Sequence, residues 1–147
     1  MNDPVFGLNN QNLVDALEKH VINSGALAIA GGTLTALIAN DVYYFISGSL
    51  YVLAAADMPA LSGTISDGYY NVYVFTVDAA GTTASAMGTE ATTVAGVVFP
   101  STPADSVVIG FVLVYTTGAT FIGGTTALSA GTVTDVYFNA TAPMRFV

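Results

Sequence analysis

Few residues in this chain have side chains suited to catalysis. The chain contains one histidine, His20, and no cysteine, so a thiol nucleophile, a disulfide and a zinc–thiolate site are excluded. A nucleophilic triad needs a hydroxyl, a histidine base and a carboxylate in contact, and the G-x-S-x-G turn that presents such a serine in α/β-hydrolases is absent. His20 falls near the end of a predicted helix, where a histidine suits the helix dipole. The preferred interpretation is therefore a surface residue of that helix.

Ten acidic residues remain as candidates for acid–base chemistry. A glycosidase needs two carboxylates flanking the scissile bond, but the chain has no tryptophan to stack on a sugar. Aspartate at a turn commonly accepts hydrogen bonds from its own backbone. Five aspartates fall at predicted turns or strand ends, namely Asp57, Asp67, Asp78, Asp105 and Asp135. We predict no catalytic residue, and a hydrolase is kept only as the weakest alternative.

Metal and cofactor sites have no signature in the sequence. The H-E-x-x-H motif, Cys/His clusters and the EF-hand loop are all absent. The pairs Gly31-Gly32 and Gly123-Gly124 lack the lysine and the helix start that a phosphate cradle needs. No cofactor and no resident metal are expected. A Ca²⁺ ion held by turn carboxylates and carbonyls is the one alternative left open.

The composition is unusual in its lack of charge. Of the 147 residues only 8% are charged and 53% are hydrophobic, whereas ordinary soluble domains carry about 25% charged residues. A chain with so few charged side chains either lies in a membrane or covers much of its surface with partners. A spanning helix needs about 20 apolar residues, and the longest candidate, 26–39, is interrupted by Gly31, Gly32 and Thr33. The sequence therefore favours partner proteins over a membrane.

The charge that is present excludes several partners. The net charge is −8, and Lys19 and Arg145 are the only strong cations. Binding of nucleic-acid phosphates requires several lysine and arginine residues, and so does attachment to an anionic membrane surface. We therefore expect neither a nucleic-acid partner nor a membrane.

The chain divides into three predicted parts. Residues 1–11 form an irregular arm, because Pro4 and Gly7 break regular structure. A short N-terminal helix is predicted over 12–24, with apolar residues at helical spacing and Gly25 after its end. Residues 25–147 form a single β domain. Its predicted strands are 26–30, 33–39, 41–47, 49–55, 69–78, 82–88, 91–98, 107–116, 119–122 and 132–139.

The clearest hairpin joins residues 69–77 to 82–87 through Asp78-Ala79-Ala80-Gly81. Gly81 occupies the position that requires a positive φ after a type I turn. Regular turns between short strands indicate a mainly β fold, either a β-sandwich or a jelly-roll-like barrel, with the one short helix before it.

Two strands, 70–77 and 107–115, are apolar or aromatic on both faces. A strand with one solvated face should alternate apolar and polar residues, so both faces of these strands must be covered. The second cover is another subunit, the helix or a loop. Aromatic residues are favoured anchors at interfaces, and the candidates for the oligomer interface are Tyr70, Tyr73, Phe75, Phe111 and Tyr115.

Several stretches in this order resemble small virion proteins of tailed bacteriophages, of the head decoration or cement type. The likeness spans most of the chain, and it rests on Asn12–Leu17, Gly31-Gly32, Phe45–Tyr51, Phe99–Ala104, Val108–Val112 and Phe121–Leu128. The resemblance implies a β-rich protein that oligomerises, often as a trimer, and binds the outer surface of the capsid. It carries over no catalytic residue.

The resemblance completes the functional hypothesis. We expect a non-enzymatic structural protein that binds copies of itself and the major capsid protein, on the outside of the virion. The candidates for contact with the particle lie in the arm and the helix, at Phe6, Leu8, Leu13 and Leu17. A phage tail, fibre or receptor-binding module is the alternative. Copy number in the virion separates the two.

Overall fold

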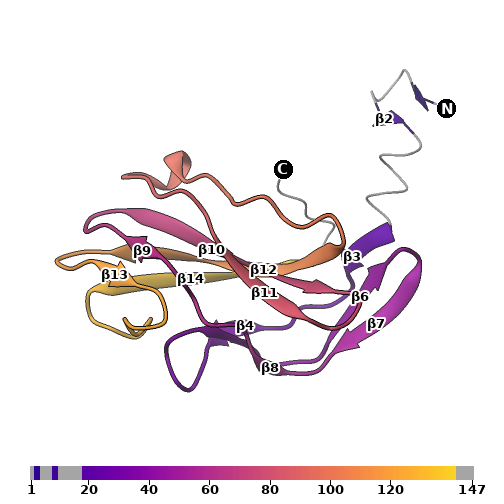
Figure 1. Ribbon diagram of the computed structural model, residues 1–147, viewed down its shortest axis with the longest axis horizontal. Coiled ribbons are helices and arrows are strands. Elements are labelled where there is room, and N and C mark those ends of the chain that lie inside the picture. Colours follow the sequence, from indigo (N-terminus) through magenta and orange to yellow (C-terminus); the bar gives the residue numbers. More distant parts are fainter. Residues whose placement is uncertain (1, 4–7, 10–17, 142–147) are drawn as a thin grey trace.

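The structure, a computed structural model, describes residues 2–3, 8–9 and 18–141. Within these ranges the chain is mainly β, with short antiparallel sheets, one 3₁₀ turn at Val94–Gly96, and no α-helical element. Figure 1 shows the strands arranged in layers, with β10, β12 and β14 above β4 and β8.

The largest sheet has four strands in the order β11-β10-β12-β14. Its members are β11 (Thr83–Met87), β10 (Tyr70–Asp78), β12 (Ser106–Thr116) and β14 (Val133–Asn139). The predicted hairpin between β10 and β11 is confirmed, with Gly81 at φ 78°. One carboxylate oxygen of Asp78 accepts hydrogen bonds from the amides of Ala80 and Thr82, both at 2.8 Å, and so fixes this turn.

Two smaller sheets have three strands each. The first, in the order β3-β6-β7, contains β3 (Lys19–Val21), β6 (Val42–Ile46) and β7 (Ser49–Leu53). The second, in the order β4-β5-β8, contains β4 (Leu27–Ile29), β5 (Ala36–Ile38) and β8 (Ala56–Asp57). Two pairs of very short strands complete the set, β9 (Thr64–Ile65) with β13 (Phe121–Ile122), and β1 (Asn2–Asp3) with β2 (Leu8–Asn9).

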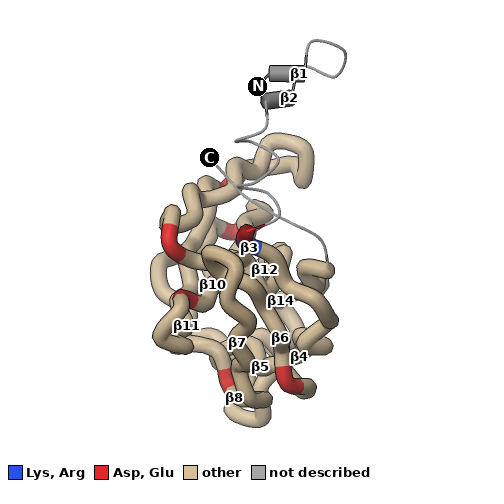
Figure 2. Tube along the Cα trace, turned by 90° about the vertical axis from the view of Figure 1, so that its right-hand side faces the viewer, with Lys and Arg blue, Asp and Glu red and all other residues tan. Residues whose placement is uncertain are grey.

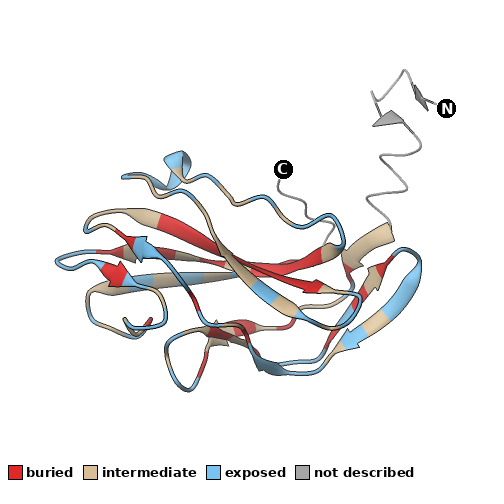
Figure 3. Cartoon of the chain, in the orientation of Figure 1, coloured by how far each residue is buried: buried red, intermediate tan, exposed pale blue. Residues whose placement is uncertain are grey.

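The main core lies between the four-stranded sheet and the two three-stranded sheets. Alternation along β10 and β6 directs one set of side chains inward. Each such buried side chain contributes roughly 1.5–3 kcal/mol relative to an exposed one. The four-stranded sheet supplies Tyr73, Phe75, Val112 and Val114, and the smaller sheets supply Val21, Ile38, Val42, Tyr44 and Ile46. Figure 3 shows this inner layer, with β10 buried along most of its length.

The predicted helix over 12–24 is wrong from Lys19 onward, although Glu18 has a helical backbone. Lys19–Val21 form β3, which pairs antiparallel with β6, with His20 opposite Phe45 and Val21 opposite Tyr44. Val21 is only 2% exposed, because strand geometry places it in the core beside Tyr44. Burial against β6 thus outweighs the helical spacing of the apolar residues. Residues 12–17 lie outside the described ranges, and β3 extends the β domain to before residue 25.

One predicted strand, 91–98, is also wrong. The segment forms the 3₁₀ turn Val94–Gly96 and is held by isolated bridges, Tyr70 to Ala91 and Thr89 to Val98. It belongs to a long connection, residues 88–105, that we call the cover loop. The strands β8 and β9 were not expected from the sequence, since two residues each are too short to show a period.

Candidate interaction surfaces

The cover loop accounts for the second apolar face of β10 and β12. Val72, Val74 and Val108 point away from the main core and form a second cluster with Ala140. Val97 and Phe99 of the cover loop pack against this cluster. The cover was one of three that the sequence allowed, and it comes from a loop of the same chain. The two-sided strands therefore do not require another subunit over this region.

The cover loop is tightly attached to the sheet. Its first part pairs with the start of β10, since Tyr70 N donates to Ala91 O at 2.7 Å and Ala91 N donates to Tyr70 O at 2.9 Å. The Glu90 carboxylate accepts one hydrogen bond from Ser66 N at 2.7 Å and another from Ser66 Oγ at 2.8 Å. At Gly88 there is no room for a side chain, because an added Cβ would clash with Val98 O. The loop is thus part of the folded domain.

The candidates for the oligomer interface separate into two groups. Tyr73 and Phe75 are 1% and 0% exposed and lie in the core of their own subunit, so their assignment to an interface is wrong. The inward side of β10 takes them into the space between the sheets. Tyr70, Phe111 and Tyr115 lie on the opposite side of the sheet and are half-buried, and their role at an interface stays a prediction.

The candidates for particle contact cannot be placed. Phe6, Leu13 and Leu17 lie outside the described residues, and Leu8 is described only as part of the backbone of β2. Their assignment also stays a prediction.

An apolar surface covers the outer side of β12 and β14, next to the cover loop. The register places Phe111 opposite Phe138, Leu113 opposite Val136, and Tyr115 opposite both Tyr70 and Thr134. Val136 and Phe138 are 45% and 42% exposed. We call this surface the aromatic face, and its residues are Tyr70, Phe111, Leu113, Tyr115, Val136 and Phe138.

Ring contacts order the aromatic face. The rings of Phe111 and Phe138 stack with centroids 4.7 Å apart, and those of Tyr70 and Tyr115 stack at 4.4 Å. Phe99 of the cover loop meets Phe111 edge to face at 4.9 Å. Such pairs contribute about 0.5–1.5 kcal/mol beyond area burial. The face is therefore a preorganised, uncharged surface that loses little side-chain entropy on binding.

A second apolar surface lies on the outer side of the β3-β6-β7 sheet. Tyr43 is opposite Val52 and Phe45 is opposite Leu50, and both pairs point away from the core. Leu50 and Val52 are 57% and 56% exposed, which Figure 3 shows as the pale blue of β7. We call this surface the β7 face, and its residues are Ile22, Tyr43, Phe45, Leu50 and Val52. This face was not predicted from the sequence, although the strands around Ser47-Gly48 are apolar on both sides.

Four carboxylates in the described structure accept hydrogen bonds from the backbone. Besides Asp78 and Glu90, Asp41 Oδ1 accepts from Ala55 N at 2.9 Å, and Asp67 Oδ1 accepts from Gly118 N at 2.6 Å. The prediction that Asp135 lies at a turn or a strand end is wrong, because Asp135 lies inside β14. Figure 2 shows the acidic residues dispersed over the molecule. Within the described ranges, no three His, Asp or Glu side chains come close enough to hold a metal ion.

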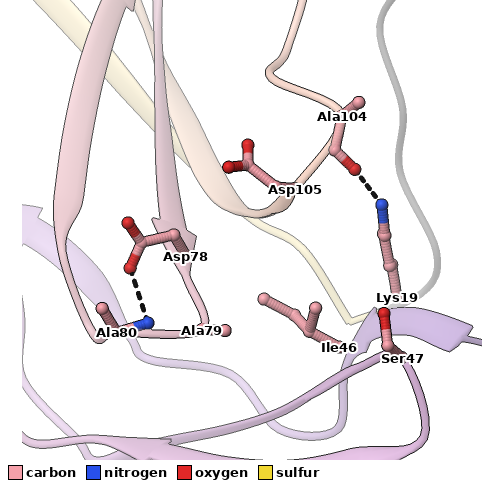
Figure 4. Close-up of a pocket in the computed structure, with 8 residues that line it drawn as sticks. All are labelled: Lys19, Ile46, Ser47, Asp78, Ala79, Ala80, Ala104 and Asp105. Atoms are coloured by element: carbon pink, nitrogen blue, oxygen red, sulfur yellow. Dashed lines mark hydrogen bonds between the residues drawn. The ribbon is translucent and has the colours of Figure 1, made fainter.

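A shallow depression of about 360 Å³ contains the one described lysine (Figure 4). Lys19 Nζ donates a hydrogen bond to the carbonyl oxygen of Ala104, and this contact ties β3 to the end of the cover loop. Asp78 on the same rim uses its carboxylate within the β10–β11 turn. The full lining is Lys19, Ile46, Ser47, Asp78, Ala79, Ala80, Ala104 and Asp105. Lys19 and Asp78 thus make contacts within the fold, and the depression is not a candidate ligand site.

Two tyrosines on the inner side of the four-stranded sheet have buried hydroxyl oxygens. Tyr73 and Tyr137 flank Val112 on neighbouring strands, and the Tyr73 hydroxyl has no hydrogen-bond partner among the described residues. Burial raises the pKa of Tyr73 to about 12. Burial also raises the pKa of Tyr137, and the nearby Asp135 carboxylate raises it further. Both phenols are therefore held neutral in the folded chain well above the ordinary pKa of tyrosine.

Comparison with known proteins adds no relative. No protein family, no curated protein and no solved structure matches the chain. The resemblance to phage virion proteins accordingly stays a prediction. No helix within the described residues is long and apolar enough to cross a membrane.

Proposed function

We propose that this chain is a non-enzymatic structural protein of a tailed-phage virion, which decorates the outside of the capsid. In this role it associates with copies of itself and binds the major capsid protein across neighbouring shell subunits. For the fold we propose the β-sandwich class, because one core is enclosed between the four-stranded sheet and the smaller sheets.

The aromatic face is the observation that carries this proposal. It presents two exposed apolar side chains, Val136 and Phe138, and the Phe138 ring stacks on Phe111. It contains no acidic or basic residue, although the chain has a net charge of −8. Depletion of charge and enrichment of aromatic residues are typical of the buried centre of a protein–protein interface. A catalytic site would instead bring polar groups together in a concave pocket.

The binding mechanism is burial of this face against the shell. Each Å² of apolar surface removed from water contributes roughly 25 cal/mol before ordering costs are subtracted. A single copy would bind weakly by this means. Several linked copies bind together with a high effective concentration, and so reinforce the junctions between shell subunits. The net negative charge suits an outer position, away from the packaged DNA.

The proposal is tested by rebinding to shells from which the protein has been removed. Phe138→Asp is expected to abolish rebinding, because a carboxylate would have to be desolvated at the interface. Leu34→Asp is the matched control, since Leu34 is also exposed, at 38%, but lies between β4 and β5. Equal rebinding of both variants, with equal urea midpoints, would contradict the assignment of the aromatic face.

Copy number tests the particle assignment separately. Quantitative mass spectrometry of the virion should find hundreds of copies if the protein decorates the shell. A few or a few dozen copies would instead support the tail or receptor-binding alternative.

A further inference from the structure

The edge strand β7 leaves backbone groups unpaired. Ser47 and Gly48, with φ 51° and 77°, form a two-residue turn between β6 and β7. Such a turn makes Ile46 and Ser49 a hydrogen-bonded pair, and pairs alternate from there. The N–H and C=O groups of Leu50 and Val52 therefore point away from β6. In agreement, the C=O of Tyr43, opposite Val52, accepts from Ile22 N at 2.8 Å and so points toward β3.

The other two long edge strands are protected. Beside β11, Ser85 Oγ donates to Ala60 O at 3.1 Å, and the Met87 side chain fills the space at Gly63. On β14, Asp135 places a carboxylate in the middle of the edge, and Asn139 Oδ1 accepts from Leu27 N at 2.8 Å. Charges and covering segments are the usual means by which proteins block pairing at a sheet edge.

The edge of β7 has none of these protections among the described residues. Its sequence, Ser49-Leu50-Tyr51-Val52-Leu53, contains no charge, proline or glycine. No described hydrogen bond reaches the outward backbone groups of Leu50 or Val52. Because both side chains are more than half exposed, backbone and side chains at this edge are open to the same partner.

The distribution of acidic residues favours a second copy of the chain as that partner. The chain carries ten acidic residues, yet none lies between Val42 and Leu53, as Figure 2 shows for the β6–β7 hairpin. A two-fold interface places one patch against itself, so in so acidic a chain the self-pairing patch must be uncharged. A basic partner would instead be attracted to the acidic residues elsewhere on the surface.

We propose that β7 pairs antiparallel with β7 of a second copy, about a two-fold axis at Tyr51. Leu50 of each copy then exchanges hydrogen bonds with Val52 of the other, and the β3-β6-β7 sheet continues across both molecules. The two β7 faces join into one apolar surface. This inference specifies the self-association included in the proposed function, and it predicts a dimer where the resemblance implies a trimer.

The size of the contact sets its strength. Edge-to-edge pairing places the two β7 faces side by side, so the contact consists of the backbone hydrogen bonds of β7 and the cross-strand side-chain pairs beside them. Such a contact buries less surface than the roughly 1,200–2,000 Å² of a standard specific interface. The dimer should therefore dissociate on dilution.

Sedimentation over a dilution series of the full chain tests the pairing. Wild type should pass from dimer to monomer, and Val52→Lys should raise the dimer dissociation constant by at least tenfold, because it places an ammonium on each edge. Leu34→Lys, at an exposed apolar residue off the edge, should leave the constant unchanged. A monomeric wild type at high concentration, a trimer, or a Val52→Lys variant that dimerises like wild type would overturn the inference.

A disulfide trap tests the register, since the chain has no cysteine of its own. Tyr51→Cys places a thiol next to its own copy across the axis, at a non-hydrogen-bonded position where Cα atoms lie about 4.5 Å apart. Mild oxidation should cross-link it. Val52→Cys, which would face Leu50, should cross-link at least tenfold more slowly. Equal rates would overturn the register.

The two proposals can fail separately. If Val52→Lys is monomeric but still rebinds shells weakly, self-pairing through β7 and shell binding through the aromatic face both stand. Loss of shell binding by wild type, with the β7 dimer intact, would remove the capsid assignment alone.

Discussion

The outer side of β10 and the outer side of β7 have similar sequences and opposite surroundings. Val72 and Val74 on β10 are 0% and 1% exposed beneath the cover loop, whereas Leu50 and Val52 on β7 are 57% and 56% exposed. Both strands are apolar on two sides. The difference shows that a two-sided apolar strand predicts the presence of a cover without identifying its source. For β10 the cover is a loop of the same chain, whereas the outer side of β7 stays exposed in one chain, and the proposed pairing of two β7 edges joins two such surfaces side by side.

Aspartate substitutions at matched positions on β10 and β7 should give the largest difference in the free energy of unfolding. Val74→Asp would bury an unpaired carboxylate under the cover loop and should lower the free energy of unfolding by about 4 kcal/mol. Val52→Asp places the same group in water and should change it by less than about 1 kcal/mol. Urea unfolding of dilute, monomeric protein measures both. Equal losses would show that the outer side of β7 is also covered within a single chain.

The second-largest expected effect is a loss of folding stability at high pH, through Tyr73 on β10. The pKa of Tyr73 is raised to about 12, while in the unfolded chain tyrosine titrates near 10. Between these values the folded state retains a proton that the unfolded state has lost, so stability falls as pH rises. A two-unit difference corresponds to about 2.7 kcal/mol.

Unfolding of wild type and Tyr73→Phe from pH 9 to 12 measures this loss, and we expect the variant to show a shallower decline. Tyr43→Phe removes a hydroxyl from a ring that is 45% exposed and serves as the matched control. A decline in Tyr73→Phe as steep as in wild type would assign the alkaline sensitivity to other groups.

The attachment of the cover loop has the smallest expected effect. Gly88→Ala adds a Cβ against Val98 O and the Val72 side chain, and should lower the free energy of unfolding by about 2 kcal/mol. Gly31→Ala, which meets nothing within 4 Å, is the control. Hydrogen exchange at the amides of Val72 and Val74 should quicken only in the first variant. Unchanged exchange there would mean that the loop is not what shelters β10.

The parts of the fold that local chemistry decides were predictable. Gly81 and Asp78 mark the β10–β11 turn, and the runs around Ser47-Gly48 mark β6 and β7. The failures are segments that depend on distant partners. Val21 satisfies both a helical and a strand period, and only its contact with Tyr44 decides between them. Residues 91–98 have side chains that favour strands. In the structure, however, only isolated bridges hold this segment, from Ala91 to Tyr70 and from Val98 to Thr89.

The sequence predicted that aromatic residues form an exposed surface, but it did not identify which of them do so. Aromatic residues on β10 and β12 were expected at an interface, and Tyr70, Phe111 and Tyr115 do lie on the outer side of the sheet. Tyr73 and Phe75 share the same strand and residue types, but alternation turns them into the core. Which side faces inward depends on the packing of the two layers, and a single strand does not contain that information.

Because of the position of Lys19, trypsin cleavage would report the local detachment of β3 from β6. Trypsin cuts only after lysine and arginine, and the chain has one of each, Lys19 and Arg145. Lys19 is paired in β3 opposite Ile46, and its amine is bound to Ala104 O. Cleavage at this bond requires β3 to detach from β6 first, so its rate follows the population of that opened form. A partner that clamps the β3-β6-β7 sheet would lengthen the lifetime of this bond, even if it never touched the lysine.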